Sequence, residues 1–213
     1  MKLLISFLTS FLWVYTLQYD VAYQPRLGHK WYVYKLVMLT NLNFVLDTIY
    51  SVFLVYTTMR RTRCRMTPIM DFVYFTSIFP IAVVTCLLFW GLYFINPDLV
   101  MPEWIAKLIP SWLNHMTHTF PLVFVLMDSF LNKRRPPTKK TLFLMSVFLV
   151  SLYFLVIFYT RFVDGYWLYP LLGLLSPIHF TFVFLGSIIG FYMITLFGKC
   201  INRLFWGTKL KGQ

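Results

Sequence analysis

A stretch of otherwise apolar sequence near residue 40 carries polar side chains at helical spacing. Thr40, Asn43 and Asp47 stand at i, i+3 and i+7, so a helix places them in one stripe on its surface. Inside a membrane-spanning helix an ionisable side chain costs about 3 kcal/mol, and such groups usually face the bundle interior with a functional role. The stripe therefore indicates a helix face that lines a polar site.

A second polar stretch lies further along the chain. Asn114 and His118 are i, i+4 neighbours, and His115 and His118 are i, i+3 neighbours, so this helix also has a polar face. Pro121 removes one backbone hydrogen bond and predicts a kink close to His118. The two polar faces are candidates for one site between helices.

The two stretches together supply a nucleophile and a base. A Thr hydroxyl is a weak nucleophile until a neighbouring base takes its proton, and His is the commonest base at neutral pH. Thr40 lies nine residues into its predicted helix and His118 eight residues into the other, which puts both about 12–14 Å below the same membrane surface. We therefore predict that Thr40 and His118 form a catalytic pair.

Four neighbouring polar residues receive supporting roles in this hypothesis. Asn43 or Asn114 would donate hydrogen bonds to an oxyanion, and Asp47 or His115 would orient the imidazole of His118.

Two other interpretations of these residues stay open. Thr, Asn and His side chains in membrane helices also tie helices together through hydrogen bonds, without any chemistry. A single zinc ion is possible by ligand count, with these candidate ligands: Asp47, His115, His118 and His179. An i, i+3 His pair alone is weak evidence for zinc, so we predict no metal and no cofactor.

The composition indicates which elements position these groups. Hydrophobic residues make up 59% of the 213 residues and charged residues only 12%, whereas about a quarter of a soluble domain is charged. These values exclude a disordered chain and a disulfide scaffold, and they argue against a water-soluble enzyme.

A membrane-spanning helix needs about 20 mostly apolar residues. We predict an all-α polytopic membrane protein, a single domain over residues 1–213, with one bundle of six transmembrane helices at approximately Leu3–Tyr19, Trp31–Tyr56, Phe72–Ile95, Pro110–Leu131, Thr141–Tyr159 and Leu168–Phe197.

The net charge of +12 permits a nucleic-acid binder, but its distribution along the chain indicates membrane orientation instead. Six spans put both termini on one side, and 14 of the 19 Lys and Arg residues fall on that side. The other five are Arg26, Lys30, Lys35, Lys107 and Arg161. Cationic residues in short loops stay in the cytoplasm. We therefore predict cytoplasmic termini and no nucleic-acid partner.

Two local patterns have structural interpretations. The basic clusters over residues 60–65 and 133–140 are interpreted as orientation signals that touch anionic lipid. Gly186 and Gly190 form a GxxxG pattern in the last span, which predicts close helix packing inside the bundle, with dimerisation as the alternative.

Four segments resemble a known family across nearly the whole chain. Residues 35–50, which contain Thr40 and Asn43, resemble the Thr-containing second-helix motif of the androgen-induced gene and androgen-dependent TFPI-regulating proteins. Residues 109–119 read I-P-S-W-L-N-H-M-T-H-T and are similar to that family's I-P-x-W-L-N-H-x-x-H-T segment. Residues 96–102 and 165–170 resemble two further loop patterns of the family.

The resemblance implies a multi-span membrane hydrolase that cleaves fatty acid esters of hydroxy fatty acids with a Thr nucleophile and an essential His. Matched by motif, these residues are Thr40 and His118. Two positions depart from the pattern: Asp47 stands where Gln is frequent, and Met116–Thr117 replaces a small residue followed by Met. The implied partner is a lipid ester taken from the bilayer, and the implied location is the endoplasmic reticulum, the plasma membrane or both.

The alternative function is a small transporter or receptor, which would use the same intramembrane polar cluster to bind a lipid or a polar head group. The sequence makes no prediction of oligomeric state.

Overall fold

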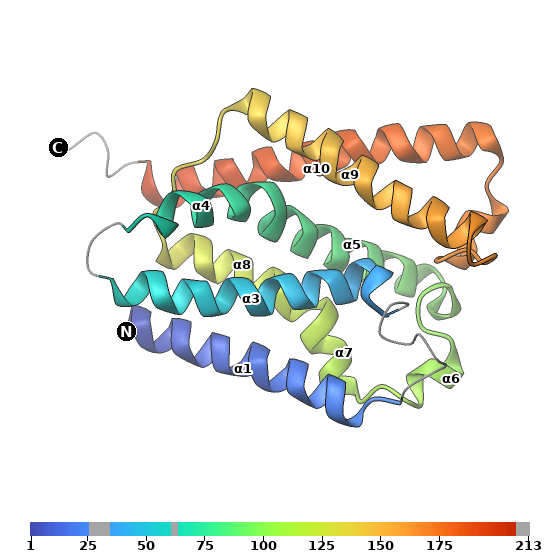
Figure 1. The fold of residues 1–213 in the computed structure, drawn as a ribbon, viewed down its shortest axis with the longest axis horizontal. Coiled ribbons are helices and arrows are strands. Elements are labelled where there is room, and N and C mark those ends of the chain that lie inside the picture. Colours follow the sequence, from blue (N-terminus) through green and yellow to red (C-terminus); the bar gives the residue numbers. More distant parts are fainter. Residues whose placement is uncertain (26–34, 61–63, 208–213) are drawn as a thin grey trace.

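The computed structural model describes residues 1–25, 35–60 and 64–207, and the regular elements in these ranges are all helical (Figure 1). The single long helices are α1 (Lys2–Tyr23), α3 (Leu39–Met59), α9 (Lys139–Phe162) and α10 (Pro177–Trp206). Two further segments are composite. In one, α4 (Met66–Val73) continues through the short π-helix η1 (Tyr74–Ile78) into α5 (Phe79–Ile95), and in the other, α7 (Ser111–His118) is followed by α8 (Phe120–Leu131). The short elements η2 (Pro97–Leu99), α6 (Glu103–Ala106) and η3 (Pro170–Leu174) belong to connections. Figure 1 shows the start of α1 and the end of α10 at the same end of the bundle.

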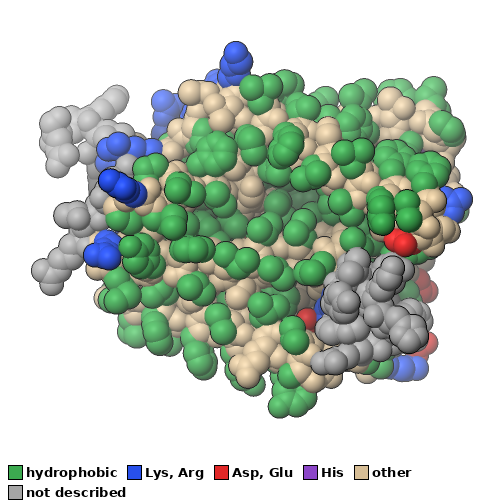
Figure 2. All heavy atoms as spheres, viewed as in Figure 1, with side chains coloured by type: hydrophobic (Ala, Val, Ile, Leu, Met, Phe, Trp, Pro, Cys, Tyr) green, Lys and Arg blue, Asp and Glu red, His purple; other side chains and the backbone are tan. Residues whose placement is uncertain are grey.

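Among the described residues, four segments are long and apolar enough to cross a membrane: α3, α4 to α5, α9 and α10. α8 is a shorter apolar helix. Hydrophobic side chains cover the middle of the face in Figure 2, while Lys and Arg gather mainly at the end that holds the start of α1, and Asp and Glu lie toward the other end. Large apolar side chains such as Leu155 and Phe182 are about two-thirds exposed, at 64% and 67%. A surface this apolar is typical of a protein embedded in lipid.

One apolar core joins all the long segments. It contains Trp13 from α1, Phe44 from α3, Tyr74 from η1 and Phe124 from α8, each at most 1% exposed. Leu142 from α9 belongs to the same core. The ring of Trp13 packs against those of Phe44 and Phe124 at centroid distances of 5.6 and 5.7 Å. This core holds the helices that carry the polar stretches at defined positions.

The second predicted span, Trp31–Tyr56, begins earlier in the chain than the helix α3. Residues 31–34 lie outside the described residues, but Met38 is extended, with φ −71° and ψ 133°, and α3 begins only at Leu39. A residue with this ψ cannot belong to a continuous α-helix. Thr40 is therefore the second residue of its helix and not the ninth or tenth residue of a longer one.

The fourth predicted span is broken at the position that Pro121 indicated. α7 ends at His118 and α8 begins at Phe120, with Thr119 between them at φ −105°. Because proline has no N–H, it cannot donate to the carbonyl one turn earlier, and the helix axis changes direction there. The predicted kink is confirmed, and it lies directly after His118.

The sixth predicted span is shifted along the chain. Residues 170–174 form the short helix η3, and α10 runs from Pro177 to Trp206 instead of Leu168–Phe197. Ser176 caps α10 by accepting a hydrogen bond from the His179 backbone N–H, and Pro177 occupies the first helical position. Ser followed by Pro is a helix start signal, so the apolar residues before it belong to a connection.

The GxxxG prediction is wrong for packing within the chain. A Cβ atom placed on Gly186 or Gly190 would meet nothing within 4 Å among the described residues, so this pattern faces away from the other helices. The close approach in α10 occurs at Gly198, where a Cβ would lie 2.7 Å from the ring of Phe79. Gly198 therefore allows α10 to pack tightly on α5.

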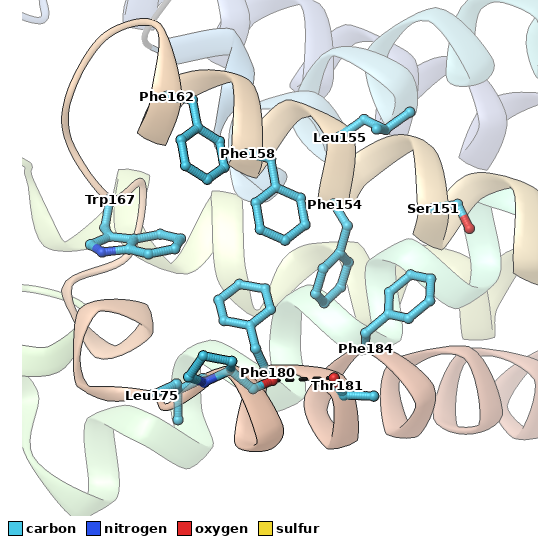
Figure 3. A pocket seen from close by; sticks show the side chains of 11 residues that line it. Ser151, Phe154, Leu155, Phe158, Phe162, Trp167, Leu175, Phe180, Thr181 and Phe184 are labelled. Atoms are coloured by element: carbon cyan, nitrogen blue, oxygen red, sulfur yellow. Dashed lines mark hydrogen bonds between the residues drawn. The ribbon is translucent and has the colours of Figure 1, made fainter.

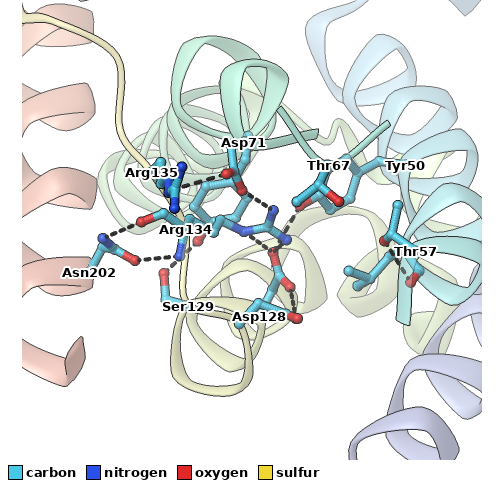
Figure 4. Close-up of polar contacts among 12 residues, drawn as sticks. Tyr50, Thr57, Thr67, Asp71, Asp128, Ser129, Arg134, Arg135 and Asn202 are labelled. Atoms are coloured by element: carbon cyan, nitrogen blue, oxygen red, sulfur yellow. Dashed lines mark hydrogen bonds and ion pairs between the residues drawn. The ribbon is translucent and has the colours of Figure 1, made fainter. Parts of the chain in front are cut away.

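The basic cluster after α8 does not simply face lipid. Arg134 is 6% exposed, and its guanidinium Nε donates to Asp128 at 3.0 Å while Nη1 lies 3.4 Å from Asp71 Oδ1 (Figure 4). The guanidinium also lies over the ring of Tyr74, 4.4 Å from its centroid. The lipid-contact prediction is thus wrong for Arg134, because two buried carboxylates on α4 and α8 draw it into the protein.

The backbone of Arg134 is also tied down. The Asn202 side chain on α10 accepts from the Arg134 N–H at 3.2 Å and donates to the Arg134 carbonyl at 3.1 Å. Asp71 also accepts a hydrogen bond from the Arg135 backbone N–H. Because its carboxylate has these partners, Asp71 can lie inside α4, which begins at Met66, although the predicted span began only at Phe72. The cluster links α4, α8 and α10 at the end of the bundle where the chain starts.

Candidate active site

The structure brings Thr40 and His118 together from two different helices. The hydroxyl Oγ1 of Thr40 lies 3.3 Å from Nε2 of His118, and both side chains are partly buried. Thr40 stands in the first turn of α3 and His118 is the last residue of α7. The pair therefore forms where the beginning of one helix meets the end of another.

The hydrogen-bond partners of Nδ1 of His118 determine which of the two ring nitrogens carries the hydrogen. Nδ1 lies 3.0 Å from the backbone carbonyl oxygen of Asn114 and 3.1 Å from the hydroxyl of Thr117. A carbonyl oxygen only accepts hydrogen bonds, so Nδ1 must carry the hydrogen in the neutral ring. Nε2 then has a free lone pair and accepts the hydroxyl hydrogen of Thr40, which is the geometry that a general base requires.

The imidazole ring is also held by packing. The ring of Phe89 on α5 stacks on His118 with a centroid distance of 3.5 Å and an interplanar angle of 17°. Thr117 in turn donates to the carbonyls of Leu113 or Asn114, at 3.1 and 3.2 Å. These contacts fix the ring plane and direct Nε2 toward α3.

The helix ends favour charge separation in this pair. The first turn of a helix carries partial positive charge and the last turn partial negative charge. Thr40 lies at the positive end of α3 and His118 at the negative end of α7. The end of α3 therefore favours negative charge on Thr40, and the end of α7 favours positive charge on His118.

Asn43 and Asp47 lie further along α3 and are fully buried. The Asn43 amide nitrogen donates to Asp47 Oδ2 at 2.9 Å, so the two predicted site residues pair with each other. Their remaining oxygens, Asn43 Oδ1 and Asp47 Oδ1, have no hydrogen-bond partner in the part of the chain that the structure describes. Neither residue forms a hydrogen bond with the side chain of Thr40 or His118.

Asn114 and His115 are placed differently from one another. Asn114 contacts His118 through its backbone carbonyl, and it is this group that orients the imidazole. His115 is exposed, its Nδ1 lies 3.1 Å from the Thr119 hydroxyl, and its ring stacks on Trp90 at 5.4 Å. His115 is therefore turned toward Trp90 and Thr119, away from the pair.

The sequence interpretation missed residues that hold the site. Phe89 lies in an apolar run without any distinguishing spacing, so no sequence signal points to it. Thr117 stands inside the N-H-x-x-H-T segment, next to His118. Tyr169, whose hydroxyl accepts the Leu39 backbone N–H at 3.2 Å, lies in the loop pattern over residues 165–170 that resembled the family. Those two motifs could have indicated both residues.

The zinc alternative finds no support in the geometry. In the described ranges, no three His, Cys, Asp or Glu side chains come together in a way that could hold a metal ion. His179, one of the candidate ligands, instead contacts Ser176 at the start of α10.

A cavity of about 630 Å³ lies between α9 and α10, apart from the Thr40–His118 pair (Figure 3). Its lining is almost entirely apolar, and Phe154, Phe158 and Phe180 point into it, with Trp167 closing one end. Ser151 and Thr181 are the polar residues of its lining. The cavity offers apolar surface but no ionisable side chain.

Comparison with known proteins gives a consistent result. The sequence matches the family described as FAR-17a/AIG1-like protein over residues 2–203. It is 32% identical to the androgen-dependent TFPI-regulating protein of Homo sapiens over 181 residues, which cover 79% of this chain and 76% of that protein. It is 31% identical to the protein of the same name from Mesocricetus auratus over 141 residues, which cover 66% of this chain and 61% of that protein.

A further relative is the androgen-induced gene 1 protein of Homo sapiens, which is 29% identical over 132 residues, 62% of this chain and 55% of that protein. The chain therefore spans less than two thirds of the length of the androgen-induced gene 1 protein and of the Mesocricetus auratus protein. No solved structure matches the chain.

Proposed function

The chain belongs to the FAR-17a/AIG1-like protein family, and from this premise we propose that it is an intramembrane hydrolase of lipid esters, with Thr40 as nucleophile and His118 as base. The observation that carries the proposal is the contact of the Thr40 hydroxyl with Nε2 of a His118 ring whose Nδ1 is already bound to a backbone carbonyl. In this arrangement the lone pair of Nε2 is free to take the proton of the Thr40 hydroxyl.

The proposed reaction consists of two acyl transfers, first to Thr40 and then to water, and His118 accepts and returns the proton in both. Thr40 Oγ1 forms a bond to the ester carbonyl carbon while its proton passes to Nε2 of His118. The bond from that carbon to the alcohol oxygen then breaks, and the alcohol oxygen takes the proton from Nε2. This leaves an acyl-Thr40 ester and a neutral imidazole. A water molecule, activated by the same nitrogen, hydrolyses the acyl ester and restores Thr40.

The substrate class in this proposal is fatty acid esters of hydroxy fatty acids. Support comes from the resemblance of the Thr40 and His118 segments and from the apolar surface over the membrane-spanning helices. In this proposal a lipid ester reaches the site from the bilayer, because apolar helices surround it and the described connections between them are short. Residence in the endoplasmic reticulum or plasma membrane belongs to the same proposal.

Thr40→Ala is expected to abolish labelling by a fluorophosphonate probe that reacts with activated Ser and Thr hydroxyls. The reason is that Thr40 Oγ1 is the atom that attacks, while His118 has no hydroxyl to label. Labelling is measured by in-gel fluorescence in membranes that contain equal amounts of each variant. Thr195→Ala is the matched control, because Thr195 is buried on α10 and, within the described ranges, its hydroxyl bonds only to the Tyr192 carbonyl.

The labelling experiment separates the proposal from its alternative. Undiminished labelling of Thr40→Ala removes Thr40 as the nucleophile. A wild-type protein that binds lipid but shows neither labelling nor ester turnover is a transporter or receptor that uses the same polar groups for binding.

The proposal includes six membrane spans, with α1 and the broken α7–α8 segment added to the four long apolar helices. Both ends of the chain then lie in the cytoplasm, which agrees with the 14 Lys and Arg residues on that side. In sealed microsomes, whose outer face is cytosolic, added protease is expected to remove an epitope placed after Gln213 and to spare a tag inserted next to Pro102. The reverse pattern would refute this orientation.

A further inference from the structure

Two tyrosine hydroxyls meet the backbone on both sides of the break before α3. Tyr153 on α9 has its Oη 3.2 Å from the carbonyl oxygen of Val37, and Tyr169 has its Oη 3.2 Å from the backbone nitrogen of Leu39. The two Oη atoms lie 2.8 Å apart. The contacts enclose Met38, the extended residue where the chain enters α3.

The direction of each hydrogen bond follows from donor chemistry. The Val37 carbonyl only accepts, so Tyr153 donates its one hydrogen to it. The Leu39 N–H donates to Tyr169, and the hydrogen of Tyr169 is left for the Tyr153 oxygen. The chain of hydrogen bonds therefore starts on the Leu39 backbone and ends on the Val37 backbone, with both hydroxyl hydrogens used.

This arrangement supplies what the start of α3 lacks. The first N–H groups of a helix have no partner within it, and a side chain at the N-cap usually accepts one of them. Met38 stands at that position and makes no side-chain cap hydrogen bond. Tyr169 accepts the Leu39 N–H in its place, although it lies 130 residues away in sequence.

We propose that Tyr153 and Tyr169 are positioning residues, a clamp that sets the direction in which α3 begins and so aims the Thr40 hydroxyl at His118. The inference rests on the proposed function of the Thr40–His118 pair. Leu39 is the residue directly before Thr40, so a rotation of the first turn of α3 moves Oγ1 relative to Nε2.

Packing holds the two rings where the clamp needs them. Tyr153, Tyr169 and Val37 pack against one apolar cluster, formed by Ile157, Leu168 and Leu172. The rings therefore keep their places when a hydroxyl is removed, and Tyr→Phe variants change only the hydrogen bonds. A reacting atom displaced by about 1 Å lowers the rate by on the order of 100-fold.

Tyr169→Phe and Tyr153→Phe are each expected to slow fluorophosphonate labelling and ester turnover by roughly 10- to 100-fold. The fall appears in kcat while KM changes little, because neither hydroxyl contacts substrate in this inference. The double variant is expected to be no slower than the slower single variant, since either change opens the same chain of hydrogen bonds. Tyr159→Phe on the exposed face of α9 is the matched control.

A second measurement separates the clamp from the hydrolase proposal. Amide hydrogen exchange over residues 39–41 is expected to be faster in both Phe variants than in Tyr159→Phe, whether or not the wild-type protein hydrolyses esters. Unchanged exchange, or labelling rates that match the Tyr159→Phe control, would overturn the clamp. A loss of labelling that only follows a loss of folded protein, measured by thermal unfolding, would assign the tyrosines a purely structural role.

Discussion

His118→Ala is expected to lower kcat for ester hydrolysis by about 10²- to 10⁴-fold, the range that a positioned general base contributes. Without the imidazole, the Thr40 hydroxyl loses the acceptor that it has among the described residues, and the leaving alcohol loses its proton donor. Turnover of a lipid ester by membranes with equal amounts of each variant measures the effect.

His115→Ala is the matched control for this substitution. His115 stands three residues earlier on α7, is exposed, and contacts Trp90 and Thr119 instead of Thr40. Its variant is expected to keep activity within a few-fold of the wild type. Full activity of His118→Ala, with its fold intact by thermal unfolding, would remove His118 from the mechanism. Equal losses in both variants would show that α7 as a whole, and not the Nε2 lone pair, is what matters.

Arg134→Met is expected to destabilise the protein by about 3–5 kcal/mol, the cost of removing one partner from a buried ion pair. The change leaves Asp128 and Asp71, which are at most 3% exposed, without the guanidinium that neutralises them. Burial by itself lowers the pKa of Arg134, but the interactions with Asp128, Tyr50 and Tyr74 together raise it by more, so the pKa lies above its ordinary value and the side chain stays charged. Thermal unfolding in detergent measures the loss.

Two further variants test the cause of that destabilisation. Arg135→Met removes an adjacent but exposed cation and is expected to change stability by less than about 0.5 kcal/mol. Arg134→Met combined with Asp71→Asn and Asp128→Asn is expected to recover part of the loss, because no buried charge is then left unpaired. A stability of Arg134→Met equal to that of Arg135→Met would show that the buried cluster contributes nothing.

Much of the helical architecture could be predicted because apolar length and proline position are local properties of a sequence. Helices lie at all six predicted spans, and Pro121 correctly indicated the break after His118. The errors occur where a helix boundary depends on a partner from elsewhere. α3 starts at Leu39, where Tyr169 contacts the chain, and α4 can include Asp71 because Arg134 pairs with it.

The candidate pair could be found from residue type, because few polar groups stand out in a chain that is 59% hydrophobic. The predicted equal depth of Thr40 and His118 in the membrane nevertheless requires a continuous helix from Trp31. Thr40 instead lies in the first turn of α3. The supporting roles were harder to predict. Which face of α7 carries His115, and which atom of Asn114 contacts the ring, depend on where Trp90 and Phe89 of α5 lie.

The sequence by itself thus determined that the protein is helical and apolar and which few side chains can do chemistry, because composition, periodicity and motif spacing are written along the chain. Tertiary structure alone decided the contact of Thr40 with His118, the tyrosine hydrogen bonds around Met38 and the burial of Arg134 beside Asp71. Each of these requires groups distant in sequence to meet within hydrogen-bond distance, such as Thr40 and His118 at 78 residues apart or Leu39 and Tyr169 at 130. Contacts of that kind arise only when the apolar core has placed every helix.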